Sequence, residues 1–445
     1  MDRRNFLCGL LGAAGGALLN SNSNLFGQQL SNKFDALPDS ARSFIDHVIV
    51  VMMENRSFDH LLGWLPNADG KQAGLTYVDV QGVAHSTYPL APDYTGCPHP
   101  DPTHSYDGGR AEYNGGSMDG FLRAGDNDLY SIGYYDEASL PFYNSLARNY
   151  TSFDRYFCSI LAGTFPNRMF QHAAQTDRLT NTAAISTLPT IWDRFAAAGI
   201  RATYYYSNVP YLGLWGAKYI PISAPYQQFL AEALAGTLPS FSFVDPRYTI
   251  LDDGTGNDDH PHADMRAGEA FMAEIFQAVT SSSLWPKTVL IFSFDEWGGF
   301  FEHVAPPRAV APNNIDPDIV KGRVLLGFRI PPVVVSPFTR GNPESPRVLH
   351  DLFDHTSVLK LLEWRWKLPP LTARDASKQI TNLNVAFDFG NPQATVPQLA
   401  TPLPYVPLAC PTGATRTFGD TFGDEESFDM PTLQQLAVSY GWPIH

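Results

Sequence analysis

The sequence predicts an α/β fold with a mostly parallel central sheet and helices on both of its faces. Five short segments are apolar throughout and rich in β-branched and aromatic residues, which indicates buried strands. Segments with helical periodicity lie between them. Strands that alternate with helices and are apolar on both faces are typical of a covered parallel sheet. In such sheets the binding site lies at the carboxyl ends of the strands.

The predicted strands span residues 47–53, 202–207, 240–244, 288–294 and 331–336. The predicted helices span residues 141–150, 189–199, 265–279 and 355–366. The second helix closes at Gly199, and the third places apolar residues at steps of four, at Ala267, Phe271, Ile275 and Val279.

The N-terminus predicts an export signal over residues 1–30. Arg3 and Arg4 form a twin-arginine pair, and a Gly/Ala-rich apolar stretch runs from about Leu7 to Leu19. This stretch is too short to span a bilayer. We therefore expect export by the twin-arginine pathway and a periplasmic or secreted protein.

The remaining chain divides into a main domain over residues 40–380 and a C-terminal segment over 381–445. Residues 66–135 are rich in Gly, Pro, Asp, Asn and Tyr and carry little periodicity, which predicts a loop-rich cap inserted over the site. The C-terminal segment is rich in Pro and Thr and is expected to be irregular and packed on the domain.

Charge and cysteine content exclude some classes of function. The formal net charge of −15 argues against nucleic acid as a partner and against an electrostatic hold on anionic membranes. Beyond the signal the chain has Cys97, Cys158 and Cys410, so at most one disulfide forms within it. None of them has the spacing of a metal finger.

Acidic side chains follow two of the predicted strands. Glu54 and Asn55 come directly after the first strand, and Asp295 and Glu296 directly after strand 288–294. Like charges placed together cost free energy unless a cation lies between them, so these four oxygen donors predict a divalent metal site. The alternative is that the acids cap helices and pair with Arg56 or a lysine.

Thr164 stands at the start of another predicted helix, in the stretch SILAGTFPNRMFQHAAQTDR (159–178). Pro166 suits the first helical turn, and a helix N-terminus favours an anion. A threonine hydroxyl there can attack phosphorus if a metal lowers its pKa. The alternative is a simple helix cap.

Four motifs in order resemble one known family. ENRSFDH (54–60), AGTFPNR (162–168), SFDEWGG with EHVAPP (293–307) and FDHTSVLKLLEWRW (353–366) are similar to the bacterial phosphoesterases that include phosphatidylcholine-type phospholipases C and AcpA-like acid phosphatases. The match runs from about residue 44 to 380. That family is similar in fold to alkaline phosphatase and sulfatases, so the resemblance implies an alkaline-phosphatase-like α/β fold.

The resemblance also implies a metal-dependent phosphoesterase with one or two ions. Its metal ligands would be Glu54, Asn55, Thr164, Asp295 and Glu296, with Thr164 also the nucleophile. The expected substrate is a phosphatidylcholine-like phospholipid, cleaved to diacylglycerol and a phosphorylated headgroup through a phospho-threonine. Transient contact with a membrane surface is expected. The alternatives are a broad acid phosphatase on monoesters and a non-catalytic surface-binding protein.

Histidines near these segments are expected to touch the phosphate or protonate the leaving group, which suits imidazole near neutral pH. His104 and His260 are the first candidates. His303 and His355 are expected to support the ligands or to cap helices, and His303 could ligate a second metal. His262 is the remaining candidate. The aromatic stretch TYYYSNVPYLGLW (203–215) predicts either core packing, a cage for a quaternary ammonium group, or contact with lipid.

Overall fold

A computed structural model describes residues 39–40, 43–249, 254–410 and 429–444. The predicted export signal lies outside the described residues. Residues Phe44–His445 form one compact unit, to which every element below belongs. Among the described residues, no helix is long and apolar enough to cross a membrane.

An eight-stranded sheet forms the centre of this unit, in the order β14-β6-β13-β10-β1-β9-β7-β8. Its middle pair, β1 (His47–Met53) and β10 (Thr288–Phe294), is parallel and in register from His47 opposite Thr288 to Met53 opposite Phe294. On one side follow β9 (Phe241–Val244), β7 (Ala202–Tyr206) and β8 (Ser223–Pro225), all parallel.

The other side of the sheet mixes directions. There β13 (Val333–Val335) runs antiparallel to both β10 and β6 (Thr151–Phe153), whereas β14 (Arg347–Leu349) is parallel to β6. The predicted α/β fold with a mostly parallel sheet is therefore confirmed. The five predicted strands are confirmed within two residues at each end, and the short strands β6, β8 and β14 were not predicted.

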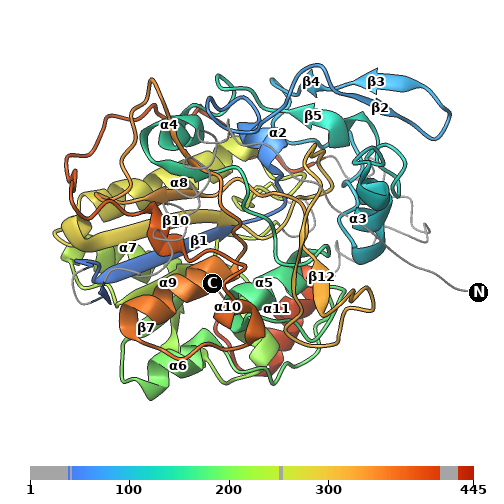
Figure 1. Ribbon diagram of the computed structural model, residues 1–445. Helices are drawn as coiled ribbons and strands as arrows, with labels where there is room; N and C mark the ends of the chain where they lie inside the picture. Colours follow the sequence, from blue (N-terminus) through green and yellow to red (C-terminus); the bar gives the residue numbers. More distant parts are fainter. Residues whose placement is uncertain (1–38, 41–42, 250–253, 411–428, 445) are drawn as a thin grey trace, which may run out of the picture. The chain divides into compact units, whose positions relative to one another are not determined.

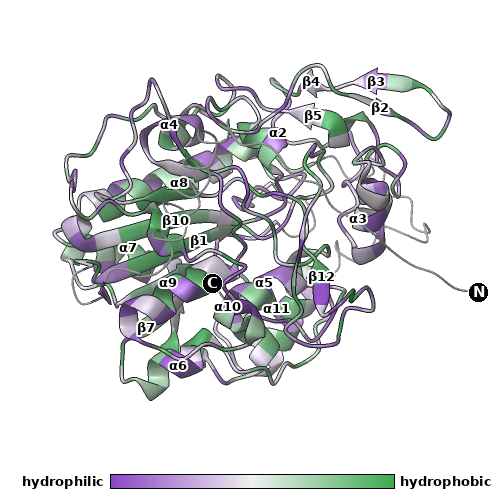
Figure 2. Ribbon diagram, in the orientation of Figure 1, coloured by the Kyte–Doolittle hydropathy of each residue, from purple (hydrophilic) through white to green (hydrophobic). Residues whose placement is uncertain are grey.

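Helices cover both faces of the sheet (Figure 1). On one face α8 (Met265–Thr280) contacts α4 (Pro141–Asn149) and α7 (Tyr226–Ala235). On the other face α5 (Thr164–Ala173) contacts α6 (Ile191–Ala197) and α9 (Thr356–Trp366), and α9 also contacts α10 (Ala373–Ala376). The central strands are buried by both layers, so they are apolar on both sides, and Figure 2 shows β1 and β10 largely green.

Residues 66–135 form the predicted loop-rich insertion. It contains the hairpin β2 (Thr76–Val78) and β3 (Ala84–Ser86), strand β4 (Tyr88–Pro89), which pairs with β5 (Gly133–Tyr134), and helix α3 (Tyr106–Tyr113). A short helix, α2 (Phe58–Leu62), precedes it and is capped by the Ser57 side chain, as its sequence predicts. A second hairpin, β11 (Arg308–Val310) with β12 (Arg323–Leu325), follows β10.

The C-terminal segment departs from the prediction at its end. Between residues 390 and 410 it has no helix or strand, as expected. However, helix α11 (Asp429–Ser439) contacts the 3-10 turn η4 (Tyr211–Trp215), and Leu433 and Ala437 are buried. The prediction of an irregular chain is wrong for these residues, because their apolar spacing extends over too few turns to stand out among polar neighbours.

Candidate active site

The carboxyl ends of β1 and β10 bring Glu54 and Asp295 to matching positions. The two strands pair up to Met53 and Phe294, and the Asp295 N–H donates to the Met53 carbonyl oxygen at 3.1 Å. Both carboxylates are buried. The two strand ends therefore lie side by side, which follows from the parallel register.

Two glycines after Glu296 let this loop approach the neighbouring segments. Gly298 and Gly299 have φ of 64° and 70°. A Cβ on Gly298 would lie 2.1 Å from the Asn55 carbonyl oxygen, and one on Gly299 would lie 2.5 Å from Pro102 Cβ. Only glycine fits both the left-handed backbone and these contacts. The Gly–Gly pair thus packs the Glu296 loop against the segments that carry Asn55 and His104.

The oxygens of Asp295 are already engaged by the protein. Its Oδ1 accepts from the backbone N–H groups of Asn55 at 3.1 Å and Glu296 at 2.7 Å. Its Oδ2 accepts from Arg168 Nε at 2.9 Å. Asp295 therefore holds the two loops and Arg168 together. Both of its carboxylate oxygens already accept hydrogen bonds, so a further ligand would share these oxygens with the existing donors.

Three other oxygens of the site are buried and have no hydrogen-bond partner among the described residues: Glu54 Oε1, Asn55 Oδ1 and Glu296 Oε1. Burial, and next the charge of Asp295, raise the pKa of the Glu54 and Glu296 carboxyls well above their usual range. Unpaired buried oxygens are costly unless a ligand completes them. Carboxylate and amide oxygens suit a hard divalent cation, so these residues fit one.

The cation that the structure does place among these acids is Arg168. Its guanidinium is fully buried and bonds Asp245 Oδ1 at 2.7 Å and Asp295 Oδ2 at 2.9 Å, and its Nη2 lies 3.5 Å from Glu54 Oε1. We call Arg168, Glu54, Asp245 and Asp295 the Arg168 cluster. Arg56, the partner considered from sequence, instead donates to the Asp259 carbonyl oxygen at 2.7 Å. One arginine does not balance three carboxylates, so the cluster favours a further positive charge.

Thr164 is the first residue of α5 and is buried, as its position in the sequence predicts. The loop before it is held by Asn167, whose Nδ2 donates to the carbonyl oxygens of Ile160, Ala162 and Gly163, at 2.6 to 3.1 Å. Arg168 follows Thr164 by four residues, on the same face of the helix. Because Arg168 bonds the acids at the strand ends, it directs this face of α5 toward them.

His104 and His260, the first candidates from the sequence, lie near each other, and Asp101 lies beside them. Their rings are 5.9 Å apart, and His260 Nε2 lies 3.6 Å from Asp101 Oδ2. Asn55 Nδ2 lies 2.8 Å from His104 Nε2, and His104 Nδ1 lies 2.7 Å from the Pro102 carbonyl oxygen. Burial lowers the pKa of His104. A neutral His104 donates through Nδ1 to the Pro102 carbonyl oxygen and accepts at Nε2 from the Asn55 amide nitrogen. The second bond fixes the orientation of the Asn55 side chain and of its oxygen.

His303 lies in a second buried cluster, with Asp59, Glu302 and Arg329, which we call the Arg329 cluster. His303 Nδ1 lies 2.5 Å from Asp59 Oδ2, and Arg329 Nη2 donates to Glu302 Oε1 at 2.6 Å and to Asp59 Oδ1 at 3.1 Å. His303 therefore contacts Asp59, and not the predicted metal ligands at the ends of β1 and β10.

The two other histidines also lie outside the ligand set. His355 Nε2 lies 3.0 Å from the Phe294 carbonyl oxygen and its Nδ1 lies 3.2 Å from Ser159 Oγ, so it supports the end of β10. His262 Nε2 donates to the His99 carbonyl oxygen at 2.9 Å.

The geometry only partly matches the predicted metal set. Among the described residues, ligand atoms of three or more His, Cys, Asp or Glu side chains lie within 4.8 Å of one another at two places: Asp101–His104–His260 and Asp59–Glu302–His303. Glu54, Asp295 and Glu296 do not converge so closely, and Arg168 contacts both Glu54 and Asp295. Candidate metal-binding groups are thus present, and the first of them borders the Arg168 cluster through His104 and Asn55.

The aromatic stretch 203–215 packs in the core. Tyr204, Tyr205, Tyr206, Tyr211 and Trp215 are all buried. Tyr204 Oη bonds Asp245, and Tyr211 Oη donates to the Phe165 carbonyl oxygen at 2.6 Å. Of the three predicted roles, this burial favours core packing over an ammonium cage or lipid contact.

Comparison with known proteins decides the family. The phosphoesterase family model matches residues 45–369. The chain belongs to the phosphoesterase family. As a member of it, the protein is a phosphoric ester hydrolase, as the sequence predicted.

Phosphoesterases with curated names are similar along most of the chain. Phospholipase C B of Mycobacterium tuberculosis is 30% identical over 100% of this chain and 98% of its own. Non-specific phospholipase C1 of Arabidopsis thaliana is 31% identical over 78% of this chain and 72% of its own. A solved alkaline phosphatase superfamily structure from Vibrio parahaemolyticus matches 76% of this chain and 71% of its own, with a TM-score of 0.37 and 12% identity.

Three site residues were not predicted from the sequence: Asp101, Arg168 and Asp245. Asp245 directly follows strand β9, just as Asp295 follows β10. Arg168 lies inside AGTFPNR, one helical turn after Thr164. Extending the search for charged residues to every strand end and to the helix face of Thr164 would have found these two.

Proposed function

We propose that this phosphoesterase is a metal-dependent phospholipase C that cleaves phosphatidylcholine-like phospholipids through a phosphorylated Thr164. The observation that carries the proposal is the set of unpaired buried oxygens on Glu54, Asn55 and Glu296, beside the helix that begins at Thr164. The names of the relatives support the substrate class. These relatives are called phospholipases C, and they are similar to this chain over nearly its whole length.

In the first step the Thr164 hydroxyl releases its proton to solvent while its oxygen attacks phosphorus, and the bond from phosphorus to the glycerol oxygen breaks. Thr164 lies at the N-terminus of α5, where the helix dipole favours the negative phosphoryl group. Asn167 holds the preceding loop and so fixes the position of the hydroxyl. Holding the nucleophile in one place lowers the entropic part of the barrier.

The leaving alkoxide needs a proton, which His260 can supply. His260 is half-buried, and its Nε2 lies 3.6 Å from Asp101 Oδ2, a position from which an imidazole can act as a general acid. His104 is buried and serves a different purpose, because it accepts from Asn55 and holds that side chain. Water then hydrolyses the phospho-threonine and releases the phosphorylated headgroup.

The metal would be held by Glu54, Asn55, Glu296 and Asp295, with Thr164 as a further ligand. When bound, a divalent cation neutralises charge on the phosphoryl oxygens and lowers the pKa of a coordinated hydroxyl. The pKa values of Glu54 and Glu296 are raised by burial and next by the charge of Asp295, and they support this assignment because a bound cation offsets both effects.

Substitutions at Thr164 test the covalent mechanism. Thr164→Val keeps the shape and removes the hydroxyl, so we expect a folded protein whose turnover falls by about a thousandfold or more. Thr164→Ser restores a hydroxyl and should retain measurable activity. Acid quench of the parent should give a mass increase on the peptide that carries AGTFPNR. Turnover of Thr164→Val within about tenfold of the parent would leave water as the attacking group.

A direct comparison of substrates tests the choice between diesters and monoesters. We expect faster turnover of phosphatidylcholine than of p-nitrophenyl phosphate by the same purified sample, together with stoichiometric divalent metal by elemental analysis. The reverse preference would make the protein a broad acid phosphatase, and no turnover of either would favour a non-catalytic surface-binding protein.

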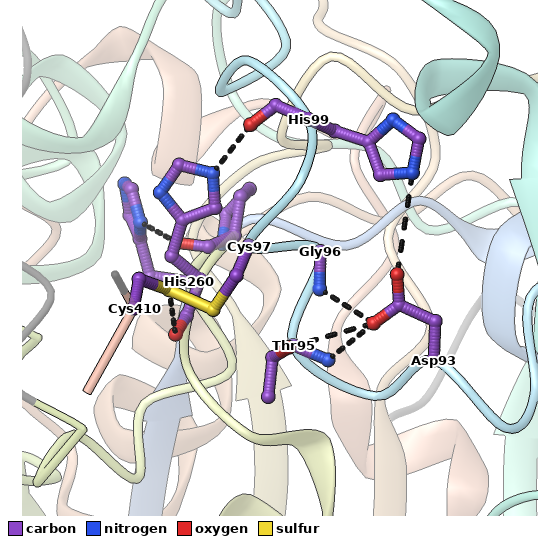
Figure 3. The surroundings of a disulfide bond; sticks show 9 residues. Asp93, Thr95, Gly96, Cys97, His99, His260 and Cys410 are labelled. Atoms are coloured by element: carbon purple, nitrogen blue, oxygen red, sulfur yellow. Dashed lines mark hydrogen bonds and ion pairs between the residues drawn. A yellow bond between two sulfur atoms is a disulfide. The ribbon is translucent and has the colours of Figure 1, made fainter. Parts of the chain in front are cut away.

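We also propose that the protein is exported by the twin-arginine pathway. A disulfide joins Cys97 to Cys410, and Figure 3 shows it with His99 and His260 around it. Disulfides persist mainly in oxidising compartments, which supports export. Cys158 is buried and free. The bond joins cysteines that are 313 positions apart. It therefore ties the C-terminal segment to the loop that leads into His104.

Replacing Arg3 and Arg4 with lysine tests the export route. The receptor reads the arginine pair itself rather than its charge, so we expect active protein to accumulate in the cytoplasm. Cell fractionation with an activity assay measures this. Unchanged export of the double variant would exclude the twin-arginine route.

A further inference from the structure

The hairpin β2–β3 exposes aliphatic side chains that the proposed chemistry does not use. The hairpin extends away from the central sheet (Figure 1), and its turn carries Val80 at 68% and Val83 at 51% exposure, with Val78 beside them at 39%. Isolated exposed valines are common on proteins, but three together on one projecting turn form a compact apolar tip.

The turn is rigid and carries little charge. Asp79 Oδ1 accepts from the N–H groups of Gln81 at 2.9 Å and Val83 at 2.8 Å, and its Oδ2 pairs with His85 Nε2 at 2.7 Å. Residues 76–86 contain no Lys or Arg, and Asp79 is their only carboxylate. These hydrogen bonds hold the Asp79 carboxylate within the turn and offset part of the cost of bringing it near an apolar medium, and the valines remain exposed beside it.

The base of the hairpin is fixed to the loop of the active site. Tyr77 is buried, and its ring lies 6.0 Å from that of Phe301 and 5.6 Å from that of Phe121. Phe301 belongs to the same loop as Asp295 and Glu296 and accepts, through its carbonyl oxygen, from Ser57 Oγ at 2.7 Å. The base of the hairpin is therefore packed against the segment that carries the site.

We propose that the valines of this turn insert into the apolar edge of a phospholipid surface and hold the enzyme on it. The proposal rests on the proposed function, because a lipid surface is the natural occupant only if the substrate is a phospholipid. The net charge of −15 excludes attraction to anionic headgroups, whereas a neutral aliphatic tip suits a zwitterionic surface. Binding should therefore depend little on salt.

The test uses the full chain and two double variants. Val80→Asp with Val83→Asp places charge on the tip. The matched control, Leu234→Asp with Val438→Asp, changes aliphatic residues of similar exposure, 65% and 56%, on α7 and α11. Binding to phosphatidylcholine vesicles is measured by co-sedimentation at low and high salt. Turnover is measured on those vesicles and on the water-soluble p-nitrophenyl phosphorylcholine.

We expect the tip variant to bind vesicles about tenfold or more weakly and to lose vesicle turnover in proportion, with soluble turnover within about twofold of the parent. The control should match the parent throughout. Equal vesicle binding by the tip variant and the parent, or equal losses in both variants, would overturn the proposal. So would a tip variant that changes the oligomeric state, since the turn would then contact a second copy. If the parent binds vesicles through the tip but hydrolyses neither substrate, only the proposed function fails.

Discussion

The Arg168 and Arg329 clusters are both buried and both centre on an arginine, yet they differ in how fully their oxygens are satisfied. In the Arg329 cluster, Asp59 accepts from Lys71 N–H, Arg329 and the backbone and ring of His303. Among the described residues, Glu54, Asn55 and Glu296 in and beside the Arg168 cluster each keep an oxygen without a hydrogen-bond partner, whereas the Arg329 cluster has one such oxygen, Glu302 Oε2.

The carboxyl pKa values record the same difference. Burial opposes ionisation of Asp59, but Arg329 and the hydrogen bond to His303 outweigh it and lower the pKa of Asp59. Burial raises the pKa of Glu302 to about 8, so this pair shares one proton and is balanced by Arg329. Both Glu54 and Glu296 have a raised pKa. We therefore expect the Arg329 cluster to serve the fold and the Arg168 cluster to accept a cation.

Replacing single carboxyl groups with amides should show the largest difference between the two clusters. Glu54→Gln and Asp295→Asn remove anionic ligands, so we expect loss of bound metal and about a thousandfold loss of activity. Glu302→Gln mimics the protonated side chain and should keep metal and activity within about threefold. Elemental analysis and turnover of the three purified variants check this. Metal loss in Glu302→Gln would move the metal site to the Arg329 cluster.

Removing each arginine should be the next largest effect. Arg168→Met and Arg329→Met each leave buried carboxylates without their cation, which costs about 3–5 kcal/mol of unfolding free energy. Added divalent metal should recover part of the loss only in Arg168→Met, because the metal replaces the missing charge there. Thermal unfolding with metal and with chelator measures both. Equal recovery in the two variants would contradict the distinction between the clusters.

The pH dependence of stability gives the smallest effect. The pKa of Glu302 is raised from 4.5 to about 8, so its contribution is complete below 4.5 and is lost as pH rises toward 8. Glutamine does not ionise, so this loss disappears in Glu302→Gln. We therefore expect the Tm difference, variant minus parent, to be a few degrees larger at pH 8 than at pH 5. Melting curves from pH 5 to 8 measure the difference. Parallel curves would show that Glu302 ionises normally.

Much of the fold could be predicted, because its elements carry local signals. Strands β1 and β10 are apolar over all or nearly all of their length, and α8 shows a four-residue apolar spacing. The three-residue strands β6, β8 and β14 lack such a pattern, and pairing with neighbours alone defines them. The same holds for α11, whose buried residues Leu433 and Ala437 lie on a helix that contacts η4.

The candidate site divides in the same way. Glu54, Asp295 and Thr164 stand at the ends of recognisable elements, so the sequence predicted their positions in the fold. Nothing in the local sequence distinguishes His303, which bonds Asp59, from His104, which bonds Asn55. Their partners lie far away in the chain.

The sequence by itself determined the alternation of strands and helices, the acids at two strand ends, the hydroxyl at the start of α5 and the family. These follow from periodicity and from short motifs, which are local. Only the tertiary structure decided that Arg168 neutralises part of the site, that Cys97 pairs with Cys410, and that Glu54 and Glu296 keep unpaired oxygens. Charge balance and hydrogen-bond satisfaction depend on distances between residues hundreds of positions apart, which no local pattern encodes.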